Sequence, residues 1–114
     1  MTSYMLQFWA PKYLLAKPRS PAQARESGEK WHAWAQALRE AGYFVSGAQL
    51  EAVGRCVIGE EKTIADGPFG KDHVMGGYFV VSALSLEQAT DLAKGCPVLQ
   101  SGGTVEVRPL MPTD

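Results

Sequence analysis

The stretch IADGPFGKDHVMGGY, residues 64–78, decides how this chain is organised. A short apolar run ends at Asp66, and Gly67-Pro68 follows it as a turn signal. After a charged segment that contains His73, a second apolar run begins at Tyr78. We therefore expect a long, glycine-flanked connection between two strands, which gathers a carboxylate, an imidazole and free backbone amides in one place.

Upstream of this stretch the sequence predicts a strand, a helix and a hairpin. Ser20 can cap the helix, and Gly42 supplies a left-handed stop after it. Trp31 and Trp34 fall on the apolar arc of the helix at 3.6-residue spacing. The expected elements are a central strand over residues 4–9, the helix over 21–41, extended pieces over 43–45 and 48–52, and a hairpin of 54–58 with 62–66.

Downstream, the pattern predicts a strand over 78–83, a helix that Ser85 caps and Gly95 ends, and a last strand over 104–108. This order predicts an α+β fold, a ferredoxin-like β-α-β-β-α-β sandwich with a hairpin inserted in its middle. Helices would cover only one side of such a sheet, whereas the apolar density of the strands suggests that both faces are buried. We therefore expect a homodimer that assembles sheet to sheet.

Length and composition indicate a single domain over residues 1–114. The net charge of −1, without a Lys/Arg cluster, argues against nucleic-acid binding. We expect no membrane span and no signal peptide, since neither pattern is present. Cys56 and Cys96 are expected to be small apolar residues in a reducing compartment, with a disulfide or a reactive thiol as the alternative. A cytoplasmic protein without metal or cofactor is the expectation.

Two side chains could form an acid–base pair. His32 falls at the edge of the tryptophan-rich helix face, and Asp66 ends a strand. Asp66 could orient the imidazole of His32 for proton transfer. Alternatively, Asp66 is a turn-former that binds nearby backbone, and His32 is a half-exposed helix residue. We take both as candidate catalytic residues, provided that their side chains lie within hydrogen-bond reach or one water apart.

Residues near this pair are candidate ligand contacts. Trp34 could form a pocket wall, although aromatic residues at helical spacing more often belong to the core. His73 could be a solvated loop residue or a further acid–base group. Glycine amides at the strand ends could bind an anion, or the glycines could simply serve turn geometry. The candidate ligand-binding residues are Gly67, Pro68, Phe69, His73 and Trp34.

Arg108 could face a carboxylate ligand. It could equally pair with Glu106, two residues away on the same face of the strand. We expect the structural pairing.

A series of short motifs runs through the chain, in which Asp66-Gly67-Pro68-Phe69 is followed by Gly76-Gly77-Tyr78-Phe79. This series resembles the YCII-related domain family, and within it the branch named for its DGPF motif. One departure is that Gly70-Lys71-Asp72-His73 follows the motif here, whereas relatives of this branch often continue with an acidic segment. The matching pieces are Ala41-Gly42, Gly47-Ala48-Gln49-Leu50, Asp66-Gly67-Pro68-Phe69, Gly76-Gly77-Tyr78-Phe79, Leu86-Glu87-Gln88-Ala89, Cys96-Pro97 and residues 103–109.

The resemblance implies a dimeric ferredoxin-like domain of α/β-barrel type. It also implies a site built from a histidine on the first helix and an aspartate near the middle strands, places that His32 and Asp66 fit. We expect a small dimeric domain that binds or acts on a small organic molecule through this pair, by proton abstraction or elimination. The alternative is a non-catalytic dimeric interaction or regulatory module, since some members of the family are associated with transcription initiation factors.

Overall fold

The computed structural model describes residues 1–16, 19–68 and 70–112. The chain forms a four-stranded sheet with the order β2-β5-β1-β6, in which every pair is antiparallel, and a separate two-stranded sheet, β3-β4. The elements are β1 (Thr2–Pro11), α1 (Tyr13–Ala16), α2 (Pro21–Glu40), β2 (Phe44–Gln49), β3 (Gly54–Ile58), β4 (Thr63–Gly67), β5 (His73–Ala83), α3 (Leu86–Ala93), the 3-10 helix η1 (Pro97–Ser101) and β6 (Thr104–Pro109).

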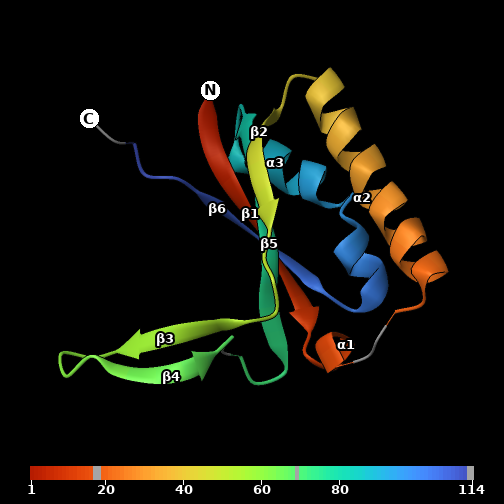
Figure 1. The fold of residues 1–114 in the computed structure, drawn as a ribbon. Helices are drawn as coiled ribbons and strands as arrows, with labels where there is room; N and C mark the ends of the chain where they lie inside the picture. Colours follow the sequence, from red (N-terminus) through yellow and green to blue (C-terminus); the bar gives the residue numbers. More distant parts are fainter. Residues whose placement is uncertain (17–18, 69, 113–114) are drawn as a thin grey trace.

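The helices that the structure describes lie on one side of the four-stranded sheet. In Figure 1, which views the sheet almost along its plane, α2, α3 and η1 all lie on its right. The hairpin of β3 and β4 leaves the sheet toward the opposite side. We call the sheet surface without helices the open face.

Alternation along the two central strands separates the core from the open face. On β1, Tyr4, Leu6 and Phe8 are buried, and Leu6 is fully buried. On β5, Val81 and Ala83 are also fully buried. Because side chains of a strand alternate between its faces, these residues point toward the helices, and their neighbours point to the open face. Burying this inner face against α2 and α3 supplies the main hydrophobic contribution to folding.

Helix α2 begins and ends where the sequence predicts. Ser20 accepts a hydrogen bond from the backbone of Gln23, and the Gln23 side chain accepts one from the backbone of Ser20, which completes a capping box. Gly42 follows the helix with φ +83°, in the left-handed region that glycine adopts without strain. The hairpin strands β3 and β4 likewise lie close to their expected ranges.

Strand β5 is longer than expected and corrects the interpretation of the quoted stretch. It begins at His73 rather than Tyr78, so the connection after β4 shortens to residues 68–72. Gly76-Gly77 lies inside the strand and is not a turn. A Cβ on Gly77 would approach the carbonyl oxygen of Ala48 to 2.8 Å, so close strand contact explains the glycine.

The mixed α+β architecture with an antiparallel sheet and two main helices is confirmed. Its strand order is compatible with a ferredoxin-like fold, with β3 and β4 as an insertion between β2 and β5. Among the described residues, no helix has the length and apolar character needed to cross a bilayer.

Leu6→Ala tests where the core lies. Leu6 is fully buried at the centre of the sheet, so the substitution should lower the free energy of unfolding by about 3 kcal/mol. Urea denaturation at one fixed protein concentration measures this change. Leu84→Ala is the matched control, because Leu84 is 75% exposed and its loss should cost less than about 0.5 kcal/mol. Equal losses for the two variants would contradict this assignment of the core.

Candidate functional site

His32 lies on α2 with its side chain exposed. Arg39 follows it by seven residues, which is two helical turns, and so belongs to the same stripe of the helix. The Arg39 guanidinium lies 4.4 Å from the centre of the Phe44 ring in β2. His32 therefore faces the side of the helix next to the edge strand β2, which has no further strand beyond it in the described sheet.

Trp34 belongs to an aromatic cluster between α2 and the sheet. Its ring stacks on Phe79 with centres 5.0 Å apart and an interplanar angle of 18°, and it meets Phe8 edge-on at 5.8 Å. Trp31 contacts Phe8 and Phe79 in the same cluster. Both tryptophans are half-buried and pack against the main core. Their contacts are those of core residues, and a ligand-binding role for Trp34 stays a prediction.

Asp66 lies on β4, in the hairpin that projects from the sheet. Its residue position is directly opposite Arg55 of β3, yet no ion pair or hydrogen bond joins Asp66 to another described residue. Its side chain is exposed, whereas Gly67 and Pro68 beside it are half-buried. Phe69, the next candidate ligand contact, lies outside the described residues.

One chain by itself does not bring His32 and Asp66 together. Figure 1 places α2 on the right of the sheet and β4 at the lower left, on the open-face side. Neither side chain has a hydrogen-bond partner among the described residues. Two exposed groups on opposite sides of a sheet cannot exchange a proton directly, because proton transfer requires hydrogen-bond reach or one bridging water.

His73 occupies the first position of β5, not a solvated loop. Its Nε2 lies 3.3 Å from the carbonyl oxygen of Gly102, a hydrogen bond in which the imidazole is the donor. Nearby, the Lys12 backbone amide donates to the carbonyl of Asp72 at 2.7 Å, and Lys12 Nζ donates to the carbonyl of Gly70 at 3.2 Å. These bonds fasten the start of β5 to the end of β1 and to the turn before β6. The hydrogen bond of the His73 side chain therefore has a structural role.

Charged residues of β6 do not pair as expected. Glu106 and Arg108 lie opposite Gln7 and Met5 of β1, so both belong to the open face. Within the part of the chain that the structure describes, the ion pairs are Lys30–Glu26 and Lys94–Asp91, and neither includes Glu106 or Arg108. The expected Glu106–Arg108 pair is thus not formed, and both side chains remain exposed.

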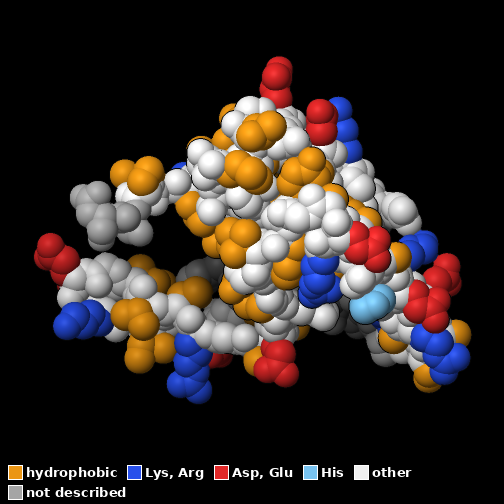
Figure 2. Space-filling view, turned by 90° about the horizontal axis from the view of Figure 1, so that it is seen from above, with side chains coloured by type: hydrophobic (Ala, Val, Ile, Leu, Met, Phe, Trp, Pro, Cys, Tyr) orange, Lys and Arg blue, Asp and Glu red, His pale blue; other side chains and the backbone are white. Residues whose placement is uncertain are grey.

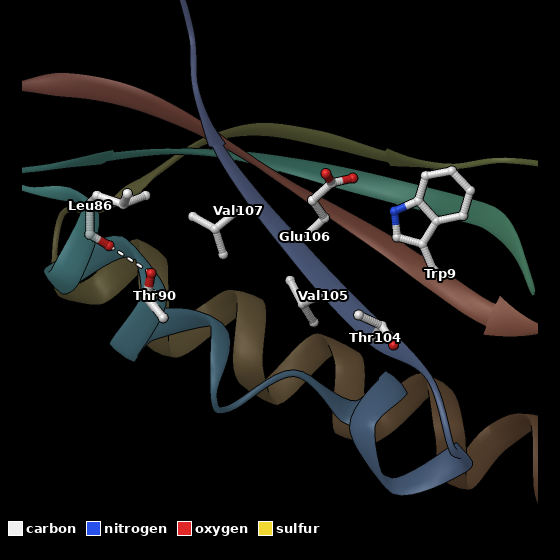
Figure 3. A pocket seen from close by; sticks show the side chains of 7 residues that line it. All are labelled: Trp9, Leu86, Thr90, Thr104, Val105, Glu106 and Val107. Carbon is white, nitrogen blue, oxygen red and sulfur yellow. Dashed lines mark hydrogen bonds between the residues drawn. The ribbon is translucent and has the colours of Figure 1, made fainter.

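A shallow depression runs along the free edge of β6 and reaches α3 (Figure 3). In the figure Val105 and Val107 point toward the helices, and Glu106 points to the other side of the strand. Thr90 donates a 2.7 Å hydrogen bond to the carbonyl of Leu86 and is therefore already satisfied. Nothing in the sequence singles out this surface. None of the candidate site residues lines the depression. Its lining is Trp9, Leu86, Thr90, Thr104, Val105, Glu106 and Val107.

The two cysteines are free and differ in environment. Cys96 is 2% exposed, and burial raises the pKa of its thiol from 9.0 to about 11, partly offset by a backbone hydrogen bond from Val98. Cys56 is half-buried on β3. Among the described residues, no group of three or more His, Cys, Asp or Glu side chains is arranged to hold a metal ion.

We predict that a maleimide labels Cys56 and spares Cys96 in the folded protein at neutral pH, because a buried, protonated thiol is a poor nucleophile. Mass spectrometry should find one label per chain, two in denaturant, and none on folded Cys56→Ser.

The Cys96 thiol keeps its proton to higher pH in the folded chain than in the unfolded chain. Its contribution to stability should therefore be complete below pH 9.0 and be lost as the pH rises through about 11. Rapid labelling of Cys96 would contradict this account.

The fold and the distribution of side chains define a class: an α+β domain with one open sheet face and a projecting hairpin. The family model for the YCII-related domain matches residues 12–114, which is most of the chain. The chain belongs to the YCII-related domain family. No match to a curated protein was found.

Proposed function

We propose that this protein is a homodimeric member of the DGPF-motif branch, and that it binds or acts on a small organic molecule at a site to which both subunits contribute. The observation that carries the proposal is the open face of the sheet. Helices cover one face, while the other presents a band of partly exposed, mostly apolar side chains on which no described helix packs. That band consists of Met5, Gln7, Trp9, Met75, Tyr78 and Val80.

The open face has the properties of a self-complementary interface. Met5 lies opposite Val80 and Gln7 opposite Tyr78 at the centre of the sheet, so the apolar band crosses both central strands. At its rim, Glu106 and Arg108 carry opposite charges and have no ion-pair partner among the described residues. A two-fold axis places the same patch on both subunits, so each rim charge can meet the opposite charge of the second copy. Sheet-to-sheet packing of this kind would give a dimeric α/β barrel.

The acid–base chemistry requires that His32 and Asp66 come from different subunits. Asp66 is carried on a hairpin that extends away from its own α2, toward the side where the second subunit would lie. His32 faces the free edge of β2, which an element of another chain can approach. Both side chains are exposed and without hydrogen-bond partners in the described chain, so both are available. The reaction class would be proton abstraction or elimination, with His32 as the base that Asp66 orients.

The second candidate function is a non-catalytic dimeric interaction or regulatory module. It is favoured by the exposure of His32 and Asp66 and by the shallowness of the grooves at β6 and α3, which include neither residue. Small-molecule sites usually enclose most of the ligand. We place the protein in the cytoplasm under both candidates, because Cys56 and Cys96 are free thiols.

Val80→Asp should separate the subunits. The substitution sets a carboxylate at the centre of the open face, where dimerisation would bury it without a partner. Light scattering after size exclusion should give a monomer at micromolar concentration. Leu99→Asp is the control: Leu99 is 44% exposed on η1, on the helix side, and this variant should stay dimeric. A dimeric Val80→Asp protein, or loss of the dimer in both variants, would contradict an interface on the open face.

Cross-linking tests whether the proposed pair forms between subunits. In a Cys56→Ser background, chains with His32→Cys and chains with Asp66→Cys are given different tags and coexpressed. A short bis-maleimide should then join unlike chains, because the two positions would face each other across the dimer. Asp66→Cys coexpressed with Lys94→Cys is the control for random encounters, since Lys94 is an exposed residue at the end of α3.

Cross-linking of the His32 and Asp66 positions no stronger than this control, in a protein that is dimeric, would contradict the shared acid–base site. That outcome would favour the non-catalytic module.

A further inference from the structure

The hairpin of β3 and β4 stands apart from the rest of the chain. Within the described part of the chain, its strands pair only with each other, as a separate two-stranded sheet. Figure 2 shows it projecting from the body, with hydrophobic side chains on its surface. The radius of gyration is 15.6 Å, against about 13 Å for a compact chain of this length. The projecting hairpin explains this extended shape.

An isolated two-stranded hairpin is only marginally stable in water. Here Val57 and Ile64 lie directly opposite each other, a β-branched pair of the kind that normally packs against another surface. In the single chain Val57 is 69% exposed and Ile64 is 65% exposed. On the other side of the hairpin, Ile58 is 47% exposed. The hairpin therefore presents an apolar pair that no part of the described chain covers.

The area of the open face, compared with the area that a stable dimer buries, suggests that a second subunit covers Val57 and Ile64. The four strands, which are six to eleven residues long and about 4.8 Å apart, present roughly 520 Å² in projection. A stable interface buries about 800 Å² of accessible surface per partner, so a contribution from the hairpin would bring the contact closer to that size. The hairpin, with five residues in each strand, adds roughly 160 Å² for each of its faces.

The exposed apolar surfaces of the open face and of the hairpin are also continuous with each other. Leu50, at the start of the link from β2 to the hairpin, donates a backbone hydrogen bond to Gly76 of β5 at 2.9 Å. Leu50 is 46% exposed and Val53, just before β3, is 77% exposed. Exposed apolar side chains thus lead from the sheet along this link to the hairpin, which lies on the open-face side.

We propose that the β3–β4 hairpin is a dimerisation arm that packs against a second copy of this chain through Val57 and Ile64. The inference rests on the proposed homodimer and adds that the arm contributes a large part of its interface. Because a two-fold axis relates the subunits, each arm reaches across to the body of the other. The arm also carries Asp66, near the end where β4 leaves the hairpin, so the same contact would bring that carboxylate close to the second subunit.

The test is a dilution series of the full chain, monitored by sedimentation. The double variant Val57→Asp/Ile64→Asp should weaken dimerisation at least about 100-fold, because two arms each lose two buried apolar side chains. Leu99→Asp is the control and should dimerise like the wild type. Circular dichroism should show that the double variant keeps its fold, since the core residues are elsewhere.

Hydrogen exchange provides a second readout that does not depend on a variant. Backbone amides of the hairpin should be protected in the wild-type dimer and should lose protection on dilution to the monomer. A dimer whose affinity is unchanged by the double variant, or whose hairpin protection is independent of concentration, would overturn the arm and leave the open-face dimer standing. A wild-type monomer would overturn both.

Discussion

The described helices cover one of the two faces of the four-stranded sheet, and this constraint shapes the rest of the structure. Leu6, Val81 and Ala83 lie on the inner face, which packs against α2 and α3 to form one hydrophobic core. Every second residue of the same strands points the other way, because alternation is fixed by strand geometry. The two main helices pack on the inner face, and the apolar band on the outer face stays partly exposed in the described chain. In the proposed dimer, the second subunit covers this band.

The same constraint organises the candidate site. His32 lies behind the sheet on α2, and Asp66 lies in front of it on the projecting hairpin. Among the described residues of one chain, both side chains are exposed and neither has a hydrogen-bond or ion-pair partner. In a face-to-face dimer the hairpin of one subunit enters the space of the other, which is the arrangement that could give Asp66 a partner. Assembly and chemistry are therefore coupled in this account.

Local signals in the sequence were sufficient for most of the elements. The Ser20 cap and the Gly42 stop fix the ends of α2 through hydrogen bonds and backbone conformation within a few residues. The start of β5 could not be predicted in this way, because Gly77 is explained by the approach of Ala48 from another strand. The position of His73 at the start of β5 also depends on a contact between distant parts of the chain. Its contact with Gly102 joins segments 29 residues apart in the sequence.

The site was less predictable than the fold. The types of His32 and Asp66 suit proton transfer, but residue type carries no information about which side of a sheet an element occupies. Trp34 illustrates the opposite case, since its helical spacing indicated a core position and it packs against Phe8 and Phe79. The exposed Val57–Ile64 pair is visible only once the register of the hairpin is known.

The mass of the wild-type chain in solution tests the central claim most directly. Light scattering coupled to size exclusion, at micromolar concentration, should give twice the 12.4 kDa of a single chain. A mass of 12.4 kDa under these conditions would contradict the account, because the open face and the hairpin would then remain in water and neither the interface nor a site shared between subunits could exist.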